Sequence, residues 1–547
     1  MRKWHLQSSI TPDSVATIKD ILLDNRQITN KEDFYNPKSP YEIGLADLGI
    51  SEEVASQIKQ KLEQIKTENG KILIFGDYDA DGINATAILW RALHSLGYQA
   101  LPFIPSRLKH GYGLSVKALQ EILAVHDDAK LLITVDNGIV AHRALQFLAK
   151  EKIEVIVTDH HQPDETVPEA FATFHSTQIC GAAVAWFLAR YLGTKTELLD
   201  ELMALMAIAT ITDLMPLVGV NRSIVLHGLT MLRKTKSVGL QHLLQIAGIQ
   251  AKNVDAYHIG FQIGPRLNAM GRLADSMNAL RLLCTNNPSK ARDLSQLLQN
   301  TNQDRQEMTE GLFESAVAMA ETMKDEVILI VDSPDFHEGI IGLLAGRLTE
   351  RFHKPSIVIN SAAEVAKASA RSLSGFHITD FIREFASDLL EFGGHPLAAG
   401  FALSKEAIDV VRPKMLARAK EILANKPLTD QLEIDMLLPM SMMSVDLVKE
   451  LDQLAPFGLA NPKPVFLIEK VQVFDWQLLG KERSHLKFKV RQAEQSFEVL
   501  AWRKAALLDQ LNINQSFDLV CQLEENIFRE QSKVQLVLQD LRPSKSV

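Results

Sequence analysis

The sequence predicts an α/β protein with three structured parts. Apolar runs at 71–75, 131–135 and 153–158 alternate with helical patterns, which predicts βαβ units and a doubly wound parallel sheet. A shorter α/β pattern begins at 327 and predicts a second, smaller α/β domain. Strand patterns follow one another after residue 464, and they predict a C-terminal OB-like β-barrel.

Length and composition are those of an ordinary multidomain protein. The 547 residues exceed a single hydrophobic core and predict three or four domains. The formal net charge of -9 gives no global sign of nucleic-acid binding, so any contact with DNA must come from local basic tracks. Three scattered cysteines exclude a disulfide framework and fit a reducing, cytoplasmic compartment. The amino terminus lacks a secretory signal, and the most apolar segment, Leu202 to Val218, is too short and too interrupted to span a bilayer.

Residues 1–65 predict a polar, helical lead-in that is broken at Asn36-Pro37 and Ser39-Pro40. The parallel sheet follows. Its elements are expected at strand 72–75, helix 83–96, strand 100–104, helix 115–124, strand 131–135, helix 141–150 and strand 153–158.

Acidic clusters follow three of these strands. In open parallel sheets the site lies beyond the carboxyl ends of the strands, so the clusters are expected to converge. Converging carboxylates repel one another unless a cation lies between them, and carboxylates with imidazoles suit Mn2+ or Mg2+. The residues are Asp77, Asp79 and Asp81 after the first strand, Asp136 after the second, and Asp159, His160 and His161 after the third.

A structural role is the alternative for each of these aspartates, because aspartate is common after strands as a turn former or helix N-cap. A cap needs one acceptor, however, and the Asp-x-Asp-x-Asp spacing of Asp77, Asp79 and Asp81 supplies three. For the set as a whole, the metal site is therefore the favoured interpretation.

Two further features belong to the part of the chain that contains the predicted parallel sheet, which we call the first lobe. The loop at 104–113 contains Arg107 and follows the strand beside the first acidic cluster, so it is a candidate phosphate clamp, with an exposed basic loop as the alternative. Asp213 ends the apolar helix 202–211, where an unpaired carboxylate would bear a desolvation cost. It is either metal-bound or a satisfied interior cap.

A long helical pattern at 289–325 leads into the second lobe. There the expected elements are strand 327–331, helix 340–352, strand 356–359 and helix 378–391. Ser369 and Arg371 suit bidentate recognition of phosphate. Gly393, Gly394 and His395 are expected in a loop before a helix start at 396–400, where backbone N–H groups could hold an anion.

The C-terminal strands are expected at 464–474, 486–491, 497–502, 516–523 and 533–541. Lys487, Lys489 and Arg491 alternate with apolar residues, so one face of their strand is a basic track that could follow single-stranded nucleic acid. Trp502 could stack on bases or lie in the core. A solvated charged face with no partner is the alternative for the track.

These motifs resemble the DHH phosphoesterase superfamily, and most closely its RecJ single-stranded-DNA exonuclease family. The resemblance is carried by Asp159-His160-His161 with the segment 76–82, and it covers nearly the full length. One position departs from the smaller members of the superfamily, which have a metal-binding histidine where this chain has Phe75, and this puts the first metal's ligand set in doubt. The motifs farther along the chain are 212–217, 264–273, 337–342 and 393–400.

The resemblance implies a hydrolase that degrades single-stranded DNA from the 5′ end to mononucleotides, in DNA repair and recombination. It implies two divalent cations, Mn2+ or Mg2+, bridged by Asp136, with Asp213 completing the second site and His395 stabilising the phosphoryl charge. The implied ligands are Asp77, Asp79, Asp81, Asp136, His160 and Asp213. Catalytic roles fall to Asp136, His160, His161 and His395. Substrate contacts fall to Arg107, Ser369, Arg371, Gly393, Gly394, His395, Arg266 and Asn268.

The same resemblance predicts a lead-in at 1–65, a DHH domain at 66–288, a connecting helix at 289–325, a DHHA1 domain at 326–426 and an OB-like domain at 427–547. It suggests a monomer, with a single-stranded-DNA-binding protein and a helicase as candidate partners. Two rival functions are a DHH phosphatase acting on small phosphate substrates and a non-catalytic replication scaffold. The basic strand face argues against the first, and the complete set of motif carboxylates argues against the second.

Overall fold

The computed structural model describes residues 2–111, 113–424, 428, 431–513, 515–529 and 531–544. It divides into two compact units. The larger unit comprises Ser39–Met215 and Ile224–Leu428, and the unit that we call the barrel unit comprises Met1–Lys38, Pro216–Ser223 and Thr429–Val547.

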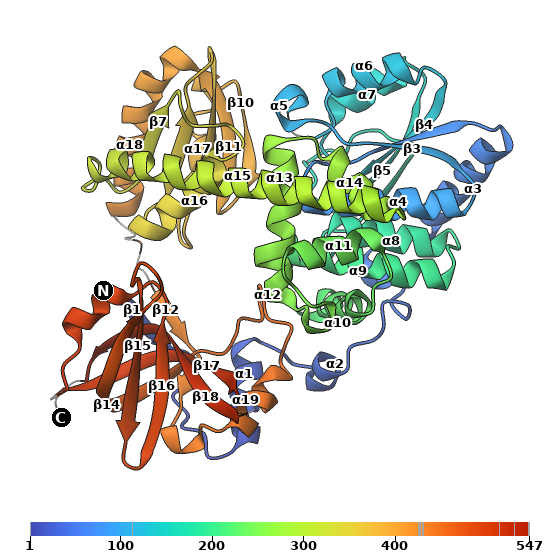
Figure 1. The fold of residues 1–547 in the computed structure, drawn as a ribbon. Coiled ribbons are helices and arrows are strands. Elements are labelled where there is room, and N and C mark those ends of the chain that lie inside the picture. The colour runs from blue at the N-terminus through green and yellow to red at the C-terminus, as the bar shows by residue number, and fades with distance from the viewer. Residues whose placement is uncertain are drawn as a thin grey trace. The chain divides into compact units, whose positions relative to one another are not determined.

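The first sheet of the larger unit has five parallel strands in the order β3-β2-β4-β5-β6. Helices α6 and α7 pack on one face through an apolar cluster that includes Leu119 and Leu145. Helices α4 and α8 contact each other on the other face (Figure 1). The expected doubly wound sheet is confirmed. Its elements are β2 Lys71–Phe75, α4 Ala80–Ser95, β3 Gln99–Phe103, α5 Arg107–His110, α6 Val116–Val125, β4 Ala129–Val135, α7 His142–Lys150, β5 Glu154–Asp159, β6 Ala172–His175 and α8 Gly181–Tyr191.

Helices before and after this sheet complete the first lobe. The buried helix α9, expected at 202–211, begins six residues earlier and ends one residue later. A π-helical turn, η3, joins α12 to α13, and the long helix α15 runs on to the second sheet (Figure 1). The bounds are α3 Glu52–Thr67, α9 Thr196–Thr212, α10 Gly219–Arg233, α11 Val238–Ile246, α12 Ala256–His258, η3 Ile259–Ile263, α13 Gly264–Leu273, α14 Met277–Cys284 and α15 Pro288–Glu321.

The second sheet has the order β10-β11-β9-β8-β7. The helix expected at 378–391 is wrong beyond Arg383, and the helix start expected at 396–400 is also wrong. Glu391 pairs with Ala402 and His395 with Ala398, so this segment is an antiparallel hairpin on the edge of the sheet. The elements are β7 Leu329–Ser333, α16 Ile341–Phe352, β8 Ser356–Asn360, β9 Val365–Arg371, α17 Ile378–Arg383, β10 Glu391–His395, β11 Ala398–Ser404 and α18 Ile408–Ala424.

The barrel unit is built on the sheet β13-β14-β15-β16-β18-β17, which closes because β14 also pairs with β17. Its core includes Phe466, Phe488 and Phe517. The first residues of the chain join this unit, because β1 pairs in parallel with β12. The elements are β1 Lys3–Leu6, α1 Val15–Asn25, α2 Lys31–Tyr35, β12 Gln431–Ile434, β13 Met436–Leu437, α19 Val445–Asp452, β14 Phe466–Leu479, β15 His485–Gln492, β16 Gln495–Ala501, β17 Ser516–Phe528 and β18 Gln531–Pro543.

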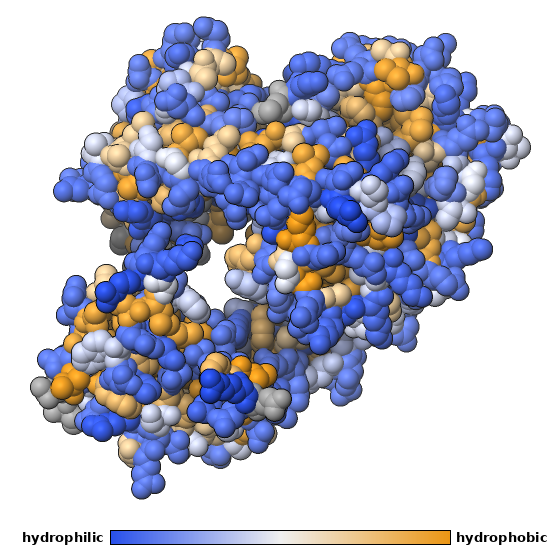
Figure 2. Space-filling model, in the orientation of Figure 1, coloured by the Kyte–Doolittle hydropathy of each residue, from blue (hydrophilic) through white to orange (hydrophobic). Residues whose placement is uncertain are grey.

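Two consequences concern the chain as a whole. The expected lead-in at 1–65 is divided between the units at Lys38, since residues up to that point pack with the barrel. The visible face of the molecule is mostly hydrophilic with small, separate hydrophobic areas (Figure 2). Within the described residues, no helix is both long enough and apolar enough to cross a bilayer.

Candidate active site

The first acidic cluster lies on the tight turn between β2 and α4. Asp79 is the N-cap of α4, where its carboxylate accepts a hydrogen bond from Gly82 N at 3.0 Å. Asp81 accepts bonds from the first two N–H groups of α8, Gly181 and Ala182, at 2.7 Å each. The capping interpretation therefore holds for these two residues in part, and it leaves each carboxylate held in a fixed orientation.

Asp136 follows β4 in a left-handed backbone conformation, with φ at 61°. A Cβ at Gly181 would lie 2.5 Å from its Oδ1, so only glycine allows the two segments to approach this closely. That Oδ1 atom is buried and has no hydrogen-bond partner among the described residues. A left-handed aspartate with an unsatisfied oxygen is a costly arrangement, and such strain is typical of functional sites.

His160 brings the remaining acidic residues together. Its Nε2 lies 3.2 Å from Asp136 Oδ1, 3.6 Å from Asp81 Oδ2 and 3.7 Å from Asp213 Oδ2. Asp213 lies at the carboxyl end of α9, where the helix dipole disfavours a negative charge. The neighbouring His161 donates from Nδ1 to Asp159 Oδ1, 2.7 Å away.

These side chains form three overlapping groups whose ligand atoms lie within 4.8 Å of one another. The group of Asp77, Asp79 and Asp136 already offers three carboxylate ligands without a histidine at the position of Phe75. Carboxylate and imidazole donors without thiolate fit Mn2+ or Mg2+, and the unpartnered Asp136 oxygen belongs to a residue shared by two of the groups. The groups are Asp77 with Asp79 and Asp136, Asp81 with His160 and Asp213, and Asp136 with His160 and His161.

The carboxylates of the cluster are buried and repel one another, and both effects favour the binding of a cation. Burial, and then the charge of Asp79, raises the pKa of Asp77 to about 8. Burial, and then the charge of Asp81, raises the pKa of Asp213 to about 9. Without a cation the carboxylates would thus hold protons near neutral pH, and a divalent metal can replace those protons.

These pKa shifts predict that a rise in pH lowers the Tm of the metal-free protein and increases the gain in Tm that Mg2+ provides. The stability that Asp77 and Asp213 contribute without metal is present below their unfolded pKa and is lost as pH rises through their folded values. We expect the Tm in EDTA to fall between about pH 6 and about pH 9, and the gain in Tm from Mg2+ to grow over the same range. Thermal unfolding by circular dichroism measures both. An Mg2+ gain that is independent of pH would contradict the assignment.

A cluster of arginines lies in the same unit. Burial, and then the charges of Arg107, Arg371 and Arg305, lowers the pKa of Arg272 to about 10. Arg371 donates to Ser369 Oγ at 3.2 Å and to Ala370 O at 2.8 Å. Among the described residues, no ion pair joins Arg107, Arg272 or Arg371 to a carboxylate. Guanidiniums that repel one another without an acid partner form a site for an anion.

Arg272 was missed at the sequence level, although it lies in the 264–273 motif. Its neighbours in that motif have other partners. Arg266 donates to Gln299 Oε1 at 2.9 Å and to Gln262 O at 2.6 Å. Asn268 accepts from Ala80 N at 2.8 Å and so supports the first acidic turn. In this structure both side chains thus contact the protein itself, and their assignment to substrate contact stays a prediction.

The hairpin residues of the second sheet are available to a ligand. Gly393, Gly394 and His395 are exposed on β10, and a Cβ at Gly393 would meet nothing within 4 Å. Burial, and then the charge of His161, lowers the pKa of His395.

The basic face of the barrel is partly neutralised by its own neighbours. Lys487 pairs with Glu498 at 2.9 Å, and Lys489 pairs with Asp475 at 2.6 Å. Arg491 donates to Gln472 at 3.1 Å. Trp502 is half exposed at the edge of the barrel, with its ring 5.0 Å from that of His485, so it is not a core residue.

Comparison with known proteins identifies the family of the chain. Family models match at residues 71–210 (DHH family, N-terminal domain), 325–425 (DHHA1 domain) and 434–540 (RecJ OB domain). A single-stranded-DNA-specific exonuclease RecJ from Dickeya dadantii is 32% identical, with 89% of this chain and 90% of the relative aligned. The chain belongs to the RecJ family. The RecJ of Bacillus subtilis is also 32% identical over 94% of this chain, which spans 65% of that longer relative.

A solved RecJ structure supports the fold and the metal site. The crystal structure of RecJ in complex with Mn2+ from Thermus thermophilus has a TM-score of 0.83 and 28% identity, and it covers 100% of this chain and 80% of its own. The corresponding complex with Mg2+ has a TM-score of 0.75 and 26% identity. The RecJ resemblance and the expected three-part fold are confirmed.

Proposed function

We propose that the protein is a metal-dependent exonuclease that hydrolyses single-stranded DNA from the 5′ end to mononucleotides. The combination of two features carries the proposal. Two ligand groups share Asp136, and three arginines without acid partners among the described residues lie in the same unit. This combination suits hydrolysis of a phosphodiester near an anionic terminus. The RecJ relatives, which are named single-stranded-DNA-specific exonucleases, support the choice of substrate.

We infer that Asp77, Asp79 and Asp136 would hold one divalent cation, and that Asp136, His160, Asp81 and Asp213 would hold the second. When bound, the two cations supply a hydroxide at neutral pH and neutralise charge on the phosphoryl oxygens. Asp159 positions His161, because its Oδ1 also accepts from the backbone N–H groups of both histidines, at 2.7 Å and 3.2 Å. It therefore acts through the two histidines rather than as a ligand itself.

The arginine cluster accounts for polarity in this proposal. Arg107, Arg272 and Arg371 would hold a terminal phosphate, with Ser369 and the exposed backbone of Gly393 beside it. A strand bound in this way is cleaved one nucleotide from its phosphorylated end.

The proposal is tested with one strand of DNA labelled separately at each end. We expect a 5′ label to be released as mononucleotide from the start of the reaction, and a 3′ label to remain on a ladder of shortening products. The reaction requires Mn2+ or Mg2+ and stops in EDTA. Early release of the 3′ label, or internal cleavage, would contradict it.

A contribution of the barrel to long substrates is a separate prediction. Replacing Lys487, Lys489 and Arg491 with glutamine should reduce the salt slope of single-stranded binding by about 0.7 for each phosphate interaction that is removed, and by about 2 at most. Since Glu498 and Asp475 neutralise two of these cations, the change of both acids to their amides should have the opposite effect and tighten binding.

The control for the barrel prediction is a dinucleotide, which can reach the metals without the barrel. Its hydrolysis should survive the triple change. Fluorescence anisotropy across a salt series measures the slope. If neither set of substitutions changes the salt slope, the basic face is merely solvated, and a phosphatase of small substrates becomes the better proposal.

On the family resemblance alone, we also propose a single-stranded-DNA-binding protein and a helicase as partners, and a cytoplasmic location.

A further inference from the structure

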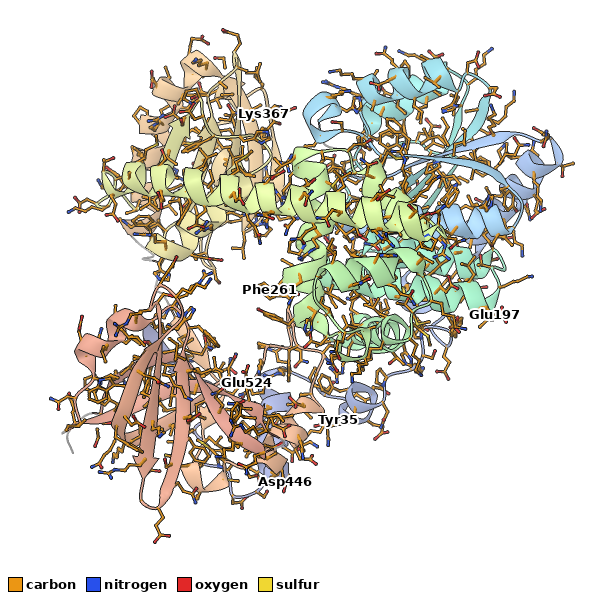
Figure 3. All side chains as sticks on the ribbon, in the orientation of Figure 1. Tyr35, Glu197, Phe261, Lys367, Asp446 and Glu524 are labelled. Atoms are coloured by element: carbon orange, nitrogen blue, oxygen red, sulfur yellow. The ribbon has the colours of Figure 1, made fainter. Side chains whose placement is uncertain are left out.

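Helix α12, the π-helical turn η3 and helix α13 form one continuous helix that carries two exposed aromatic side chains. Tyr257 is 61% exposed, and Phe261 is 70% exposed. Their ring centroids lie 4.8 Å apart, with an interplanar angle of 30°. Phe261 is labelled in Figure 3, on the side of the helix that faces away from α11. Each ring thus holds the other in place while the outer faces of the pair stay accessible.

The same helix packs on the carboxyl end of α9 through two glycines. A Cβ at Gly260 would lie 3.8 Å from Ile211 Cγ2, and one at Gly264 would lie 2.4 Å from Thr212 Cγ2. Thr212 is the last residue of α9, and the metal-ligand candidate Asp213 follows it. Each aromatic residue lies three positions before one of these glycines. The aromatic pair is therefore about one helical turn from the end of α9, beside the metal-ligand cluster of the same unit.

A third apolar side chain is exposed at this end of α9. Leu214 follows Asp213 in a left-handed backbone conformation, and its side chain is 71% exposed. In η3 the N–H of Gly264 donates to Ile259 O, and π-helical turns of this kind are frequent at functional sites. Single exposed apolar side chains need no explanation. Two stacked rings and a leucine beside a metal-ligand cluster indicate a surface that binds a ligand.

The position of this surface indicates the chemistry of its ligand. Three side chains are too few for a stable protein partner, because such an interface buries about 800 Å2 on each side. They suit the flat face of a nucleobase, which stacks on an aromatic ring whatever the identity of the base. A strand whose phosphodiester lies at the metal-ligand cluster also carries bases on either side of that phosphate. A base of the substrate is therefore the ligand that this position favours.

We propose that Tyr257 and Phe261 form an aromatic platform that stacks on an unpaired base of the strand held at the metal-ligand cluster. The inference rests on the proposed function and adds a base-contacting surface to it. Because the rings already hold each other, little side-chain freedom is lost when a base binds. A base in a duplex is paired and stacked on its neighbours, and it must leave that stack before it reaches the rings. The platform therefore favours single strands over duplexes.

The experiment moves one abasic residue along a 5′-phosphorylated strand, a position at a time, and measures kcat/KM of the full chain in Mn2+. In the parent protein we expect one or two positions near the 5′ end where loss of the base lowers kcat/KM by about 5- to 150-fold, which is the effect of one stacked base. Phe261→Leu keeps an apolar side chain but removes the ring. It should lower kcat/KM on the intact strand by a similar factor and abolish the dependence on those positions. The ratio of kcat/KM between a single strand and a blunt duplex should fall as well.

Conservative and matched variants serve as controls. Phe261→Tyr and Tyr257→Phe keep both rings and should keep the abasic profile of the parent protein. Phe171→Leu changes another exposed aromatic side chain of the same unit, just before β6 and thus at the amino ends of the strands, away from the metal-ligand cluster. It should also leave the profile unchanged. Circular dichroism should show a Tm close to that of the parent protein for Phe261→Leu, because the side chain is exposed.

The outcomes that would overturn the proposal are distinct. A parent protein with no position that depends on the base, or a profile that persists in Phe261→Leu, would remove the platform. A lower Tm in Phe261→Leu with an unchanged profile would show that the rings serve packing instead. The same abasic series, measured as binding by fluorescence anisotropy in EDTA, tests the platform without cleavage. A parent protein that binds with this dependence but cleaves no strand in Mn2+ would refute the proposed nuclease function and retain the platform.

Discussion

Replacing Asp136 with asparagine will abolish cleavage of single-stranded DNA and leave DNA binding nearly unchanged. Asp136 belongs to two of the three ligand groups, so the change removes charge from both cation positions at once. Its side chain is 2% exposed and contacts little that a strand could reach. Asparagine keeps the size of the side chain, which separates loss of charge from loss of packing beside Gly181.

Single-turnover cleavage and fluorescence anisotropy measure the two properties. The control is Glu433→Gln, which removes an exposed acid of the barrel unit away from the basic face and should leave both cleavage and DNA binding unchanged. If Asp136→Asn retained more than about a hundredth of the parent rate, a loss below about 2.7 kcal/mol, the shared-ligand role would be wrong. Loss of DNA binding together with cleavage would indicate damage to the fold.

The sheet and the acidic cluster could be predicted from the sequence for the same physical reason. Strands buried on both faces read as continuous apolar runs, so the ends of β2, β4 and β5 are visible as the points where polarity returns. Parallel topology then brings those ends to one edge. Asp77, Asp79 and Asp81 could be assigned to a metal site because a helix cap needs one acceptor and their spacing supplies three.

Other features depend on partners far away in the chain. The segment 391–404 combines glycines, alanines and proline, which read as a loop and a helix start, but pairing of β11 with β9 makes it a hairpin. In the same way β1 belongs to the barrel because it pairs with β12, more than 400 residues later. Local propensity carries no information about either pairing.

The structural roles of buried arginines are equally hidden. Arg272 and Arg266 each donate to a main-chain carbonyl, of Gly339 and of Gln262, and they differ in their other neighbours, because the charges of three arginines act on Arg272 whereas Arg266 also binds Gln299. Arg222 lies near the start of α10, and its buried guanidinium donates to the main-chain carbonyls of Phe34, Leu454 and Gln453. The sequence shows only that an arginine lies near motif residues. This does not tell whether its guanidinium binds an anion or donates to main-chain carbonyls of the protein.

The arginine cluster should make the enzyme prefer 5′-phosphorylated over 5′-hydroxyl strands, and Arg371→Lys should remove most of that preference. Arg371 presents a planar fork already oriented by Ser369 Oγ and Ala370 O, and lysine keeps the charge but not the paired donors. A charge-assisted hydrogen bond contributes about 1.5–3 kcal/mol, so the ratio of kcat/KM between the two strands should fall by about 10- to 100-fold.

The matched control is Arg383→Lys in the same lobe, an exposed arginine on α17 that pairs with Asp380 and should leave the ratio unchanged. Arg107→Lys should behave like Arg371→Lys, because Arg107 contributes to the same cluster. The measurement is initial rates on two oligonucleotides that differ only in the terminal phosphate. An Arg371→Lys enzyme that kept the parent ratio would remove Arg371 from terminus recognition, whereas an equal fall on both strands would place it at the scissile phosphate instead.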